Sequence, residues 1–304
     1  MDYILTTENL VKQYRHFKAL NGLTMHIPKG SIYGFVGKNG AGKTTLIRII
    51  CGLQKPTEGG FTLYGVNSSD SNIVKARQRV GAVVETPAIY MDMTAEDNLK
   101  QQYKVLGLSS FDSIPELIKL VGLGNTGKKK AKRFSLGMKQ RLGIAMAMAG
   151  NPDFLVLDEP TNGLDPQGII DMRELILKLN REYHITVMIS SHILDELSRL
   201  ATHYGIIDNG CMVKELNSDE LESLCRKCMR TEVSNMTGLI RVLNNMGVDY
   251  NVVSDTQADI FSKLNISQLV FALAKEDCEI ISIETRDETL ESFFISLIGG
   301  GNNA

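Results

Sequence analysis

The sequence predicts an α/β fold in which buried strands of a parallel sheet alternate with helices, and two segments support this prediction. The apolar run at residues 32–36 leads through a glycine-rich loop into the helix-like run at residues 45–50, and the apolar run at residues 154–157 ends in Asp158 and Glu159. Short apolar runs that alternate with helical segments are typical of βαβ units, whose strands are parallel. The alternation continues with predicted strands at residues 185–189 and 204–208 and predicted helices near residues 167–181 and 193–201.

The loop at residues 37–44 matches the pattern GxxxxGK[ST], and it lies between a predicted strand and a predicted helix. Glycines let successive backbone N–H groups face a polyphosphate, and the following helix N-terminus adds the positive end of its dipole. We expect Lys43 to reach the β- and γ-phosphates and the Thr44 hydroxyl to bind the Mg²⁺ that accompanies the nucleotide. An ordinary glycine turn is the alternative, which the flanking elements disfavour. The residues predicted to bind the nucleotide here are Gly37, Asn39, Gly40, Ala41, Gly42, Lys43, Thr44 and Thr45.

Residues 3–84 are predicted to form short strands around the loop and its helix, including a strand near residues 61–64. Residues 86–150 are predicted to be mainly helical. Residues 94–97 form a polar cap that opens a helix, in which Leu99, Tyr103 and Leu106 follow at helical spacing. A second helix begins at Pro115.

The carboxylates Asp158 and Glu159 stand at the end of a buried strand. In open α/β sheets, ligands bind at the carboxyl edge, so these two side chains are placed to meet the nucleotide. Asp158 suits an outer contact to Mg²⁺, and Glu159 suits the general base that polarises the attacking water. A solvated Asp-Glu pair at a strand end is the alternative.

Three further motifs follow a fixed order: residues 134–141 precede an apolar helix, residues 162–166 contain Gly-Leu-Asp-Pro, and Ser-Ser-His ends at His192. With these motifs the chain resembles the nucleotide-binding subunit of ABC transporters over roughly residues 3 to 215. Residues 135–140 stand at the signature LSGGQ, residues 163–165 at the D-loop and His192 at the switch histidine. The resemblance implies a P-loop NTPase fold of the ABC type, with a mixed-sheet core, an antiparallel β subdomain and a helical subdomain at about residues 86–150.

The resemblance also implies a mechanism that needs two ATPase subunits. Two copies of this chain, or this chain and a paralogous ATPase, would pair head to tail, so that Ser135 and Gly137 of one close over the ATP bound by the other. His192 would hold the γ-phosphate and the water, Asp165 would link the two sites, and Tyr14 would stack on adenine. For Tyr14, an aromatic near a strand end, ordinary packing is the alternative.

Glu85 departs from the family pattern, which usually has a glutamine at the end of the strand that leads into the helical subdomain. A carboxylate binds Mg²⁺ as an amide oxygen does, but when ionised it cannot donate a hydrogen bond and it adds negative charge beside the phosphates. We expect Glu85 to be a metal ligand that supports hydrolysis, and Glu85→Gln to keep part of that activity. Met138 is a second departure, at the last signature position, and it leaves Ser135 and Gly137 in place.

Glu85, the Ser-Leu-Gly-Met-Lys-Gln signature and the tail at residues 288–294 together resemble the bacitracin, lantibiotic and bacteriocin group of ABC ATPases. In that group the subunit energises a separate membrane permease that exports a peptide antibiotic or protects the cell from one. The resemblance therefore implies an ATPase that is cytoplasmic and held at the inner face of the membrane by its permease.

Composition sets bounds on the remaining possibilities. With 304 residues, 43% of them hydrophobic, the chain can form one large and one smaller domain, which we place at residues 1–215 and 216–304. The formal charge of -2 argues against a nucleic-acid partner. The sequence has no run of eighteen apolar residues and no signal-peptide features, and its five scattered cysteines do not form a disulfide scaffold, so we expect a soluble cytosolic protein with reduced thiols.

Two other functions stay open as alternatives. A soluble ABC ATPase that acts on ribosomes or DNA usually has two ATPase domains in one chain or a long coiled-coil insertion, together with a basic face. This sequence has one P-loop, no such insertion and a slightly acidic charge balance. A regulatory module with vestigial hydrolysis is disfavoured because Glu159 and His192 are both present. In the predicted C-terminal accessory domain we expect strands at residues 249–253 and 278–283 and helices near residues 237–246, 266–275 and 287–298.

Overall fold

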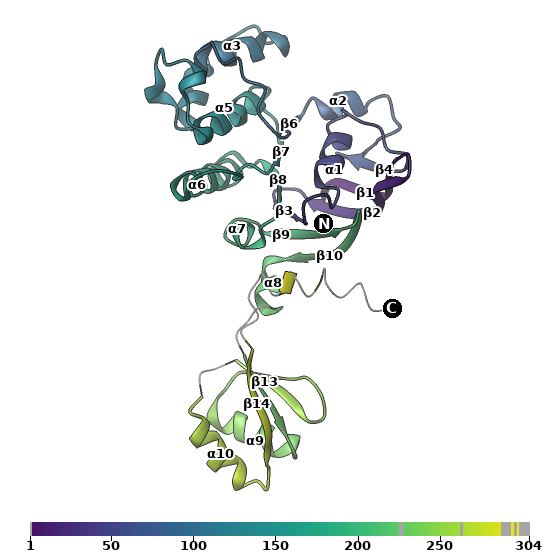
Figure 1. Cartoon of the computed structure of the whole chain (residues 1–304), viewed down its shortest axis with the longest axis vertical. Coiled ribbons are helices and arrows are strands. Elements are labelled where there is room, and N and C mark those ends of the chain that lie inside the picture. Colours follow the sequence, from purple (N-terminus) through teal and green to yellow (C-terminus); the bar gives the residue numbers. More distant parts are fainter. Residues whose placement is uncertain (1, 225–227, 262–263, 287–292, 295–296, 298–304) are drawn as a thin grey trace. The chain divides into compact units, whose positions relative to one another are not determined.

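The structure, a computed structural model, describes residues 2–224, 228–261, 264–286, 293–294 and 297, and it divides into two compact units, Met1–Ser218 and Asp219–Ala304 (Figure 1). None of the helices in these described ranges has the length and apolar character that a membrane span requires. The helix predicted near residues 287–298 lies mostly outside the residues that the structure describes.

The first unit is built on a six-stranded sheet with the strand order β10-β9-β3-β8-β7-β6. All neighbouring strands in it are parallel except β9 and β10. The strands β3, β7 and β8 are buried along their whole length, which explains the apolar runs at residues 32–36, 154–157 and 187–189. The strands span Ile32–Val36 (β3), Val80–Val83 (β6), Phe154–Asp158 (β7), Thr186–Ser191 (β8), His203–Asp208 (β9) and Cys211–Asn217 (β10).

Helices cover both faces of this sheet, as Figure 1 shows. Helix α1 lies on one face, and α6 and α7 lie on the other. These helices span Lys43–Ile50 (α1), Pro166–Tyr183 (α6) and Leu194–Ser198 (α7). The predicted alternation of strands and helices is therefore confirmed, and it brings the carboxyl ends of β3, β7 and β8 together at one edge.

A second, antiparallel sheet packs against α1, with the order β2-β1-β4-β5. It shares one core with α1 and the central sheet, in which Leu5, Leu23 and Phe61 are almost completely buried. The long β1 and β2 form a hairpin whose turn contains Arg15 in the left-handed conformation. The elements are Tyr3–Tyr14 (β1), Phe17–Pro28 (β2), Glu58–Leu63 (β4), Val66–Asn67 (β5) and the short helix Ile73–Arg77 (α2).

The helical subdomain follows β6 and contains α3 (Ala95–Val105), α4 (Ile114–Leu120) and α5 (Leu136–Met148), with short 3₁₀ turns at Gly124–Thr126 and Ala131–Arg133. The predicted polar cap is confirmed: the Thr94 side chain accepts a hydrogen bond from the Asp97 N–H, and Asp97 accepts one from the Thr94 N–H. Helix α4 has Pro115 in its first turn, as predicted. Leu99 and Tyr103 face the core, whereas Leu106 caps α3 and is exposed.

The described part of the second unit contains a four-stranded antiparallel sheet with the order β12-β13-β11-β14, whose strands alternate with the helices α9 and α10 as βαββαβ along the chain, and the short helix α8 precedes them. Its core contains Val233, Leu239, Ile260 and Leu269. The predicted strands and helices before residue 287 are observed. The elements are Ser218–Leu224 (α8), Cys228–Val233 (β11), Met236–Met246 (α9), Tyr250–Val252 (β12), Gln257–Ile260 (β13), Ile266–Ala274 (α10) and Ile280–Arg286 (β14).

Candidate functional site

The glycine-rich loop joins the carboxyl end of β3 to the N-terminus of α1. Gly40 and Gly42 have φ angles of 85° and 111°, in the left-handed region where a side chain is strained. A Cβ atom on Gly42 would lie 2.5 Å from the Ala19 carbonyl oxygen, and one on Gly37 would lie 2.6 Å from Ile207. These positions therefore require glycine, and the loop keeps the tight path that an anion-binding backbone needs.

Lys43 lies at the end of the loop, as the first residue of α1, with a side chain that is only 5% exposed. Its Nζ donates to the Gly37 carbonyl at 2.7 Å and to the Lys38 carbonyl at 3.2 Å, and it lies 3.3 Å from Oε1 of Glu159. An ammonium that is removed from water needs such partners. The loop therefore holds a fixed positive charge next to the predicted general base.

Asp158 ends β7 and is 3% exposed. Thr44 donates to its Oδ2 at 2.9 Å, and Ser190, its register partner on β8, donates to its Oδ1 at 2.6 Å. The Glu159 N–H in turn donates to the Ser190 hydroxyl at 3.0 Å. Ser190 thus joins the two carboxylate residues, and no role for it was predicted, because the contact depends on the pairing of β7 with β8.

Glu159 has a φ angle of 50°, which is unusual for a residue other than glycine. Three contacts hold this conformation: the bond to Ser190, the approach of Lys43, and Nδ1 of His192 at 2.7 Å from Oε2. Strained backbone of this kind concentrates at functional sites, where the surrounding structure fixes it. Glu159 and His192, which are far apart in sequence, are therefore held together.

The hydroxyl of Thr44 and the carboxylate of Asp158 are hard oxygen donors, which are the ligands that Mg²⁺ prefers. Over the described ranges, no group of three or more His, Cys, Asp and Glu side chains is placed to hold a metal ion by itself. Mg²⁺ typically binds through one or two protein ligands together with substrate phosphates and water. The donor set here fits a Mg²⁺ ion that arrives with its nucleotide.

A cavity of about 300 Å³ opens beside the loop and Glu159. The hydroxyl of Tyr14 hydrogen-bonds to Gln54, and Tyr14 is absent from the described lining of the cavity. Phe17, its register partner across the hairpin, is 60% exposed and does line it. Phe17 and Asn162 were not among the predicted site residues. The lining comprises Phe17, Ala19, Asn39, Gly40, Gly42, Lys43, Thr44, Thr45, Glu159 and Asn162, while Ala41 is buried within the loop.

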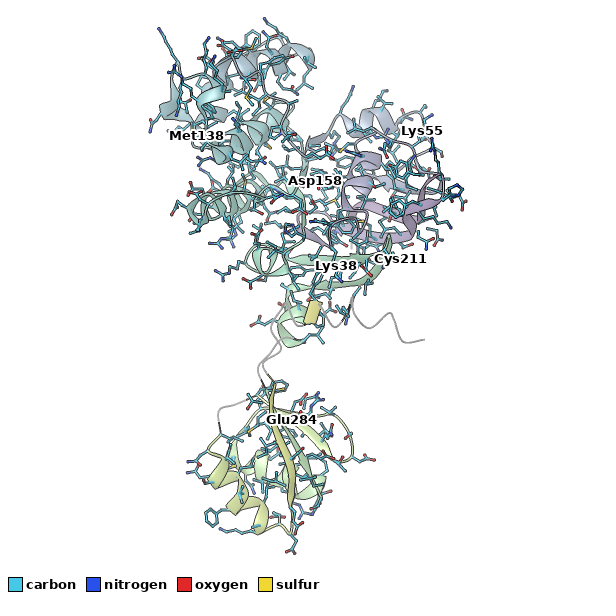
Figure 2. The ribbon with its side chains drawn as sticks, in the orientation of Figure 1. Lys38, Lys55, Met138, Asp158, Cys211 and Glu284 are labelled. Carbon is cyan, nitrogen blue, oxygen red and sulfur yellow. The ribbon has the colours of Figure 1, made fainter. Side chains whose placement is uncertain are left out.

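The signature and the D-loop line a second cavity on the same unit. Ser135 caps α5 by accepting from the Met138 N–H, and Asp165 caps α6 by accepting from the Gly168 N–H. Ser135, Gly137 and Asp165 line a cavity of about 390 Å³ that shares no described lining residue with the cavity beside Lys43. Figure 2 shows Met138 in the helical subdomain, apart from Asp158 at the sheet.

Glu85 follows β6, and its side chain bonds to Arg48 rather than to Thr44 or Asp158. Its Oε1 accepts from Nη2 of Arg48 at 2.5 Å, and its φ angle is 59°. Arg48 lies on α1, four residues after Thr44. The structure therefore brings Thr44, Asp158, Glu159 and His192 together and places Glu85 on a partner outside this group.

Comparison with known proteins agrees with this geometry. The model of the ABC transporter family matches residues 20–162. The chain is 40% identical to the bacitracin transport ATP-binding protein BcrA of Bacillus licheniformis over 304 residues, which cover 99% of each chain. It is 43% identical to the lantibiotic transport ATP-binding protein SrtF of Streptococcus pyogenes over 221 residues, which cover 73% of this chain and 94% of that protein.

Solved structures give the same result for the fold. An ATP-binding cassette solved as a dimer in a post-hydrolysis state, bound to ADP and Pi, has a TM-score of 0.64 and 26% identity, covering 70% of this chain and 98% of its own. The predicted fold class is confirmed, with its mixed central sheet, antiparallel sheet and helical subdomain. The chain therefore belongs to the ABC transporter family, in which it is an ATP-binding and ATP-hydrolysing subunit.

Proposed function

We propose that this ATPase energises a separate membrane permease that exports a peptide antibiotic of the bacitracin or lantibiotic kind, or protects the cell from one. The observation that carries the proposal is the 40% identity to a bacitracin transport ATP-binding protein over 99% of both chains, because it extends through the C-terminal unit. The chain would be cytoplasmic and would meet the membrane through its permease. No nucleic acid is expected as a partner, since the formal charge is -2.

The working form is a head-to-tail dimer, either of two copies of this chain or of this chain with a paralogous ATPase. The separation of the two cavities supports this form: Lys43 lines one, whereas Ser135 and Gly137 line the other. A single unit that binds ATP through Lys43 leaves its own signature turn unused, and a partner's signature completes the site. Asp165, in the same cavity as Ser135, would contact the partner and link the two sites.

ATP enters with its phosphates against the loop amides and its base toward the tip of the β1–β2 hairpin. The N–H groups around Gly40 and Gly42 and the Lys43 ammonium bind the β- and γ-phosphates. Tyr14 was predicted to stack on adenine, and Phe17, beside it on the hairpin and lining the cavity, adds a second aromatic surface.

Thr44 and Asp158 would hold the Mg²⁺, with Glu85 as a further ligand. An ion held by these residues would supply positive charge against the phosphates of the nucleotide. Thr44 and Asp158 already share a hydrogen bond, which fixes their oxygens next to each other.

Glu159 acts as the general base. Its carboxylate accepts a proton from the attacking water, and His192, bonded to the second carboxylate oxygen, orients it and contacts the γ-phosphate. Ser190 keeps the strained Glu159 backbone in place. Lys43 contributes a positive charge that stabilises the negative charge developing on the phosphoryl group.

Residues from about 216 onward form an accessory domain, and we assign it to contacts between subunits, to stability or to regulation. A chain truncated at about residue 217 separates these uses. Unchanged dimerisation and ATP hydrolysis in that variant would favour regulation.

Co-expression with a candidate permease, chosen from the membrane proteins encoded in the neighbouring genes, tests the transport proposal. We expect the pair to raise the concentration of bacitracin or of a lantibiotic that a sensitive strain survives, and Glu159→Gln, at equal expression, to abolish the increase. ATP hydrolysis by the purified chain without any such protection, for either class of peptide, would contradict the proposed substrate while leaving the ATPase intact.

A further inference from the structure

Arg48 and Glu85 form an ion pair that joins two parts of the nucleotide-binding unit. Arg48 lies in α1, directly after the phosphate-binding loop, and Glu85 lies in the segment that leads from β6 into the helical subdomain. Nη2 of Arg48 donates to Oε1 of Glu85 at 2.5 Å, with the two side chains 36% and 57% exposed. Because both side chains reach solvent, such a pair is weak and can exchange partners.

The position of Arg48 on α1 defines where this pair holds the carboxylate. Residues four apart on a helix lie on the same face, about one turn apart, so Arg48 is about 6 Å further along the helix than Thr44. Thr44 donates to Asp158, and these two residues are the proposed ligands of Mg²⁺. The ion pair therefore holds the Glu85 carboxylate on a side chain that starts from the same face of α1, one turn beyond Thr44.

Arg48 is itself fixed by its backbone. Its carbonyl accepts from the N–H groups of Leu53 and Gln54, in the turn that ends α1. Glu85, in contrast, is in the left-handed conformation with a φ angle of 59°, which a residue with a side chain adopts only under constraint. The main chain of Arg48 is held in the helix, whereas Glu85 lies in the connection between β6 and α3, so we take Glu85 to be the member that moves when the pair opens.

We propose that Arg48 is a positioning residue that holds Glu85 away from the metal until Mg²⁺ and nucleotide are bound. The inference rests on the proposed function, in which Glu85 is a ligand of that Mg²⁺. A carboxylate needs a counter-ion near phosphates, whereas the neutral glutamine usual in the family does not. Arg48 supplies the counter-ion while the site is empty, and Mg²⁺ takes its place when the site is filled.

Replacing Arg48 should lower the Mg²⁺ concentration that ATP binding requires. Removing Arg48 frees the carboxylate in advance, so the bound state no longer has to break the ion pair. In a hydrolysis-dead Glu159→Gln background, we expect Arg48→Gln to lower the Mg²⁺ concentration needed for half-maximal ATP binding by about two- to five-fold, the range given by exposed ion pairs. Arg48→Lys, which keeps the charge, should change it less.

The control is Arg48→Gln in a protein that also lacks the Glu85 carboxylate. With Glu85→Gln also present, Arg48→Gln should leave the Mg²⁺ dependence of binding unchanged, as measured by calorimetric titration of ATP at several Mg²⁺ concentrations. A shift of equal size with and without Glu85, or no shift in either, overturns the proposal. Urea unfolding of each nucleotide-free variant verifies the fold. Failure of the parent Glu159→Gln protein to bind Mg-ATP at all would instead refute the proposed function.

Discussion

Nδ1 of His192 lies 2.7 Å from Oε2 of Glu159, and Nζ of Lys43 lies 3.3 Å from Oε1 of the same carboxylate. Glu159 is therefore held from both sides by groups from different parts of the chain, the first residue of α1 and the residue that directly follows β8. The carboxylate that accepts the water proton in the proposed mechanism is fixed before ATP arrives. Fixed groups of this kind lose little freedom when the reaction occurs.

Replacing His192 should affect catalysis far more than binding. We expect His192→Ala to lower kcat by about 10²- to 10⁴-fold, because Glu159 loses the group that orients it. Affinity for a fluorescent ATP analogue should change little, since the loop amides and Lys43 remain. His203→Ala, at the start of β9, is the matched control and should retain kcat. Equal kcat values for the two variants would exclude a role for His192 in hydrolysis.

Replacing Ser190 should lower both stability and activity. Ser190→Ala removes the hydrogen-bond donor to Asp158 and leaves the Glu159 N–H without its acceptor. An unsatisfied buried group costs about 1–3 kcal/mol, so the free energy of unfolding in urea should fall by that amount.

The matched control is Ser31→Ala, a buried serine at the other edge of the same sheet, whose hydroxyl donates to the Pro28 carbonyl. Both variants should lose stability, but only Ser190→Ala should also lower kcat. A normal kcat in a folded Ser190→Ala protein would show that Glu159 does not need this support.

Cys51 should resist alkylation over the usual pH range. Burial raises the pKa of its thiol to about 12, with the Asp158 carboxylate adding to the rise and Arg77 opposing it. The thiolate is the reactive form, so the rate with iodoacetamide should be very low at pH 8 and rise about tenfold for each pH unit below the pKa. Peptide mass spectrometry measures this rate, with Cys211, which is partly buried as Cys51 is, as the internal reference. Labelling of Cys51 as fast as Cys211 at pH 8 would contradict the raised pKa of its thiol.

The parts of the site that could be predicted from the sequence are those whose geometry is set by the residues of one continuous segment. The loop that ends in Gly42, Lys43 and Thr44 is such a segment, because its glycines and the helix that follows form the anion site together. Asp158 and Glu159 were placed correctly at a sheet edge because a buried strand precedes them. The central parallel sheet could be predicted because its strands and helices alternate along the chain, and each can be recognised from its own residues.

The remaining contacts depend on pairings that no local pattern contains. Ser190 meets Asp158 only because β7 and β8 are neighbours in register, and Phe17 lines the cavity only because the hairpin folds back beside the loop. Glu85 was predicted as a metal ligand, whereas the structure pairs it with Arg48. That pairing joins α1 to a distant loop, and nothing in either segment alone predicts it.

The most direct test of this account is the oligomeric state of Glu159→Gln under saturating Mg-ATP, measured by size-exclusion chromatography with light scattering. Because this variant binds ATP without hydrolysing it, we predict a dimer with Mg-ATP and a monomer with ADP. Ser135→Arg in the same background should stay monomeric while still binding ATP, since it blocks the signature alone. If Glu159→Gln stays a monomer with bound Mg-ATP, both alone and together with its permease, the head-to-tail site does not form and the proposed transport mechanism fails.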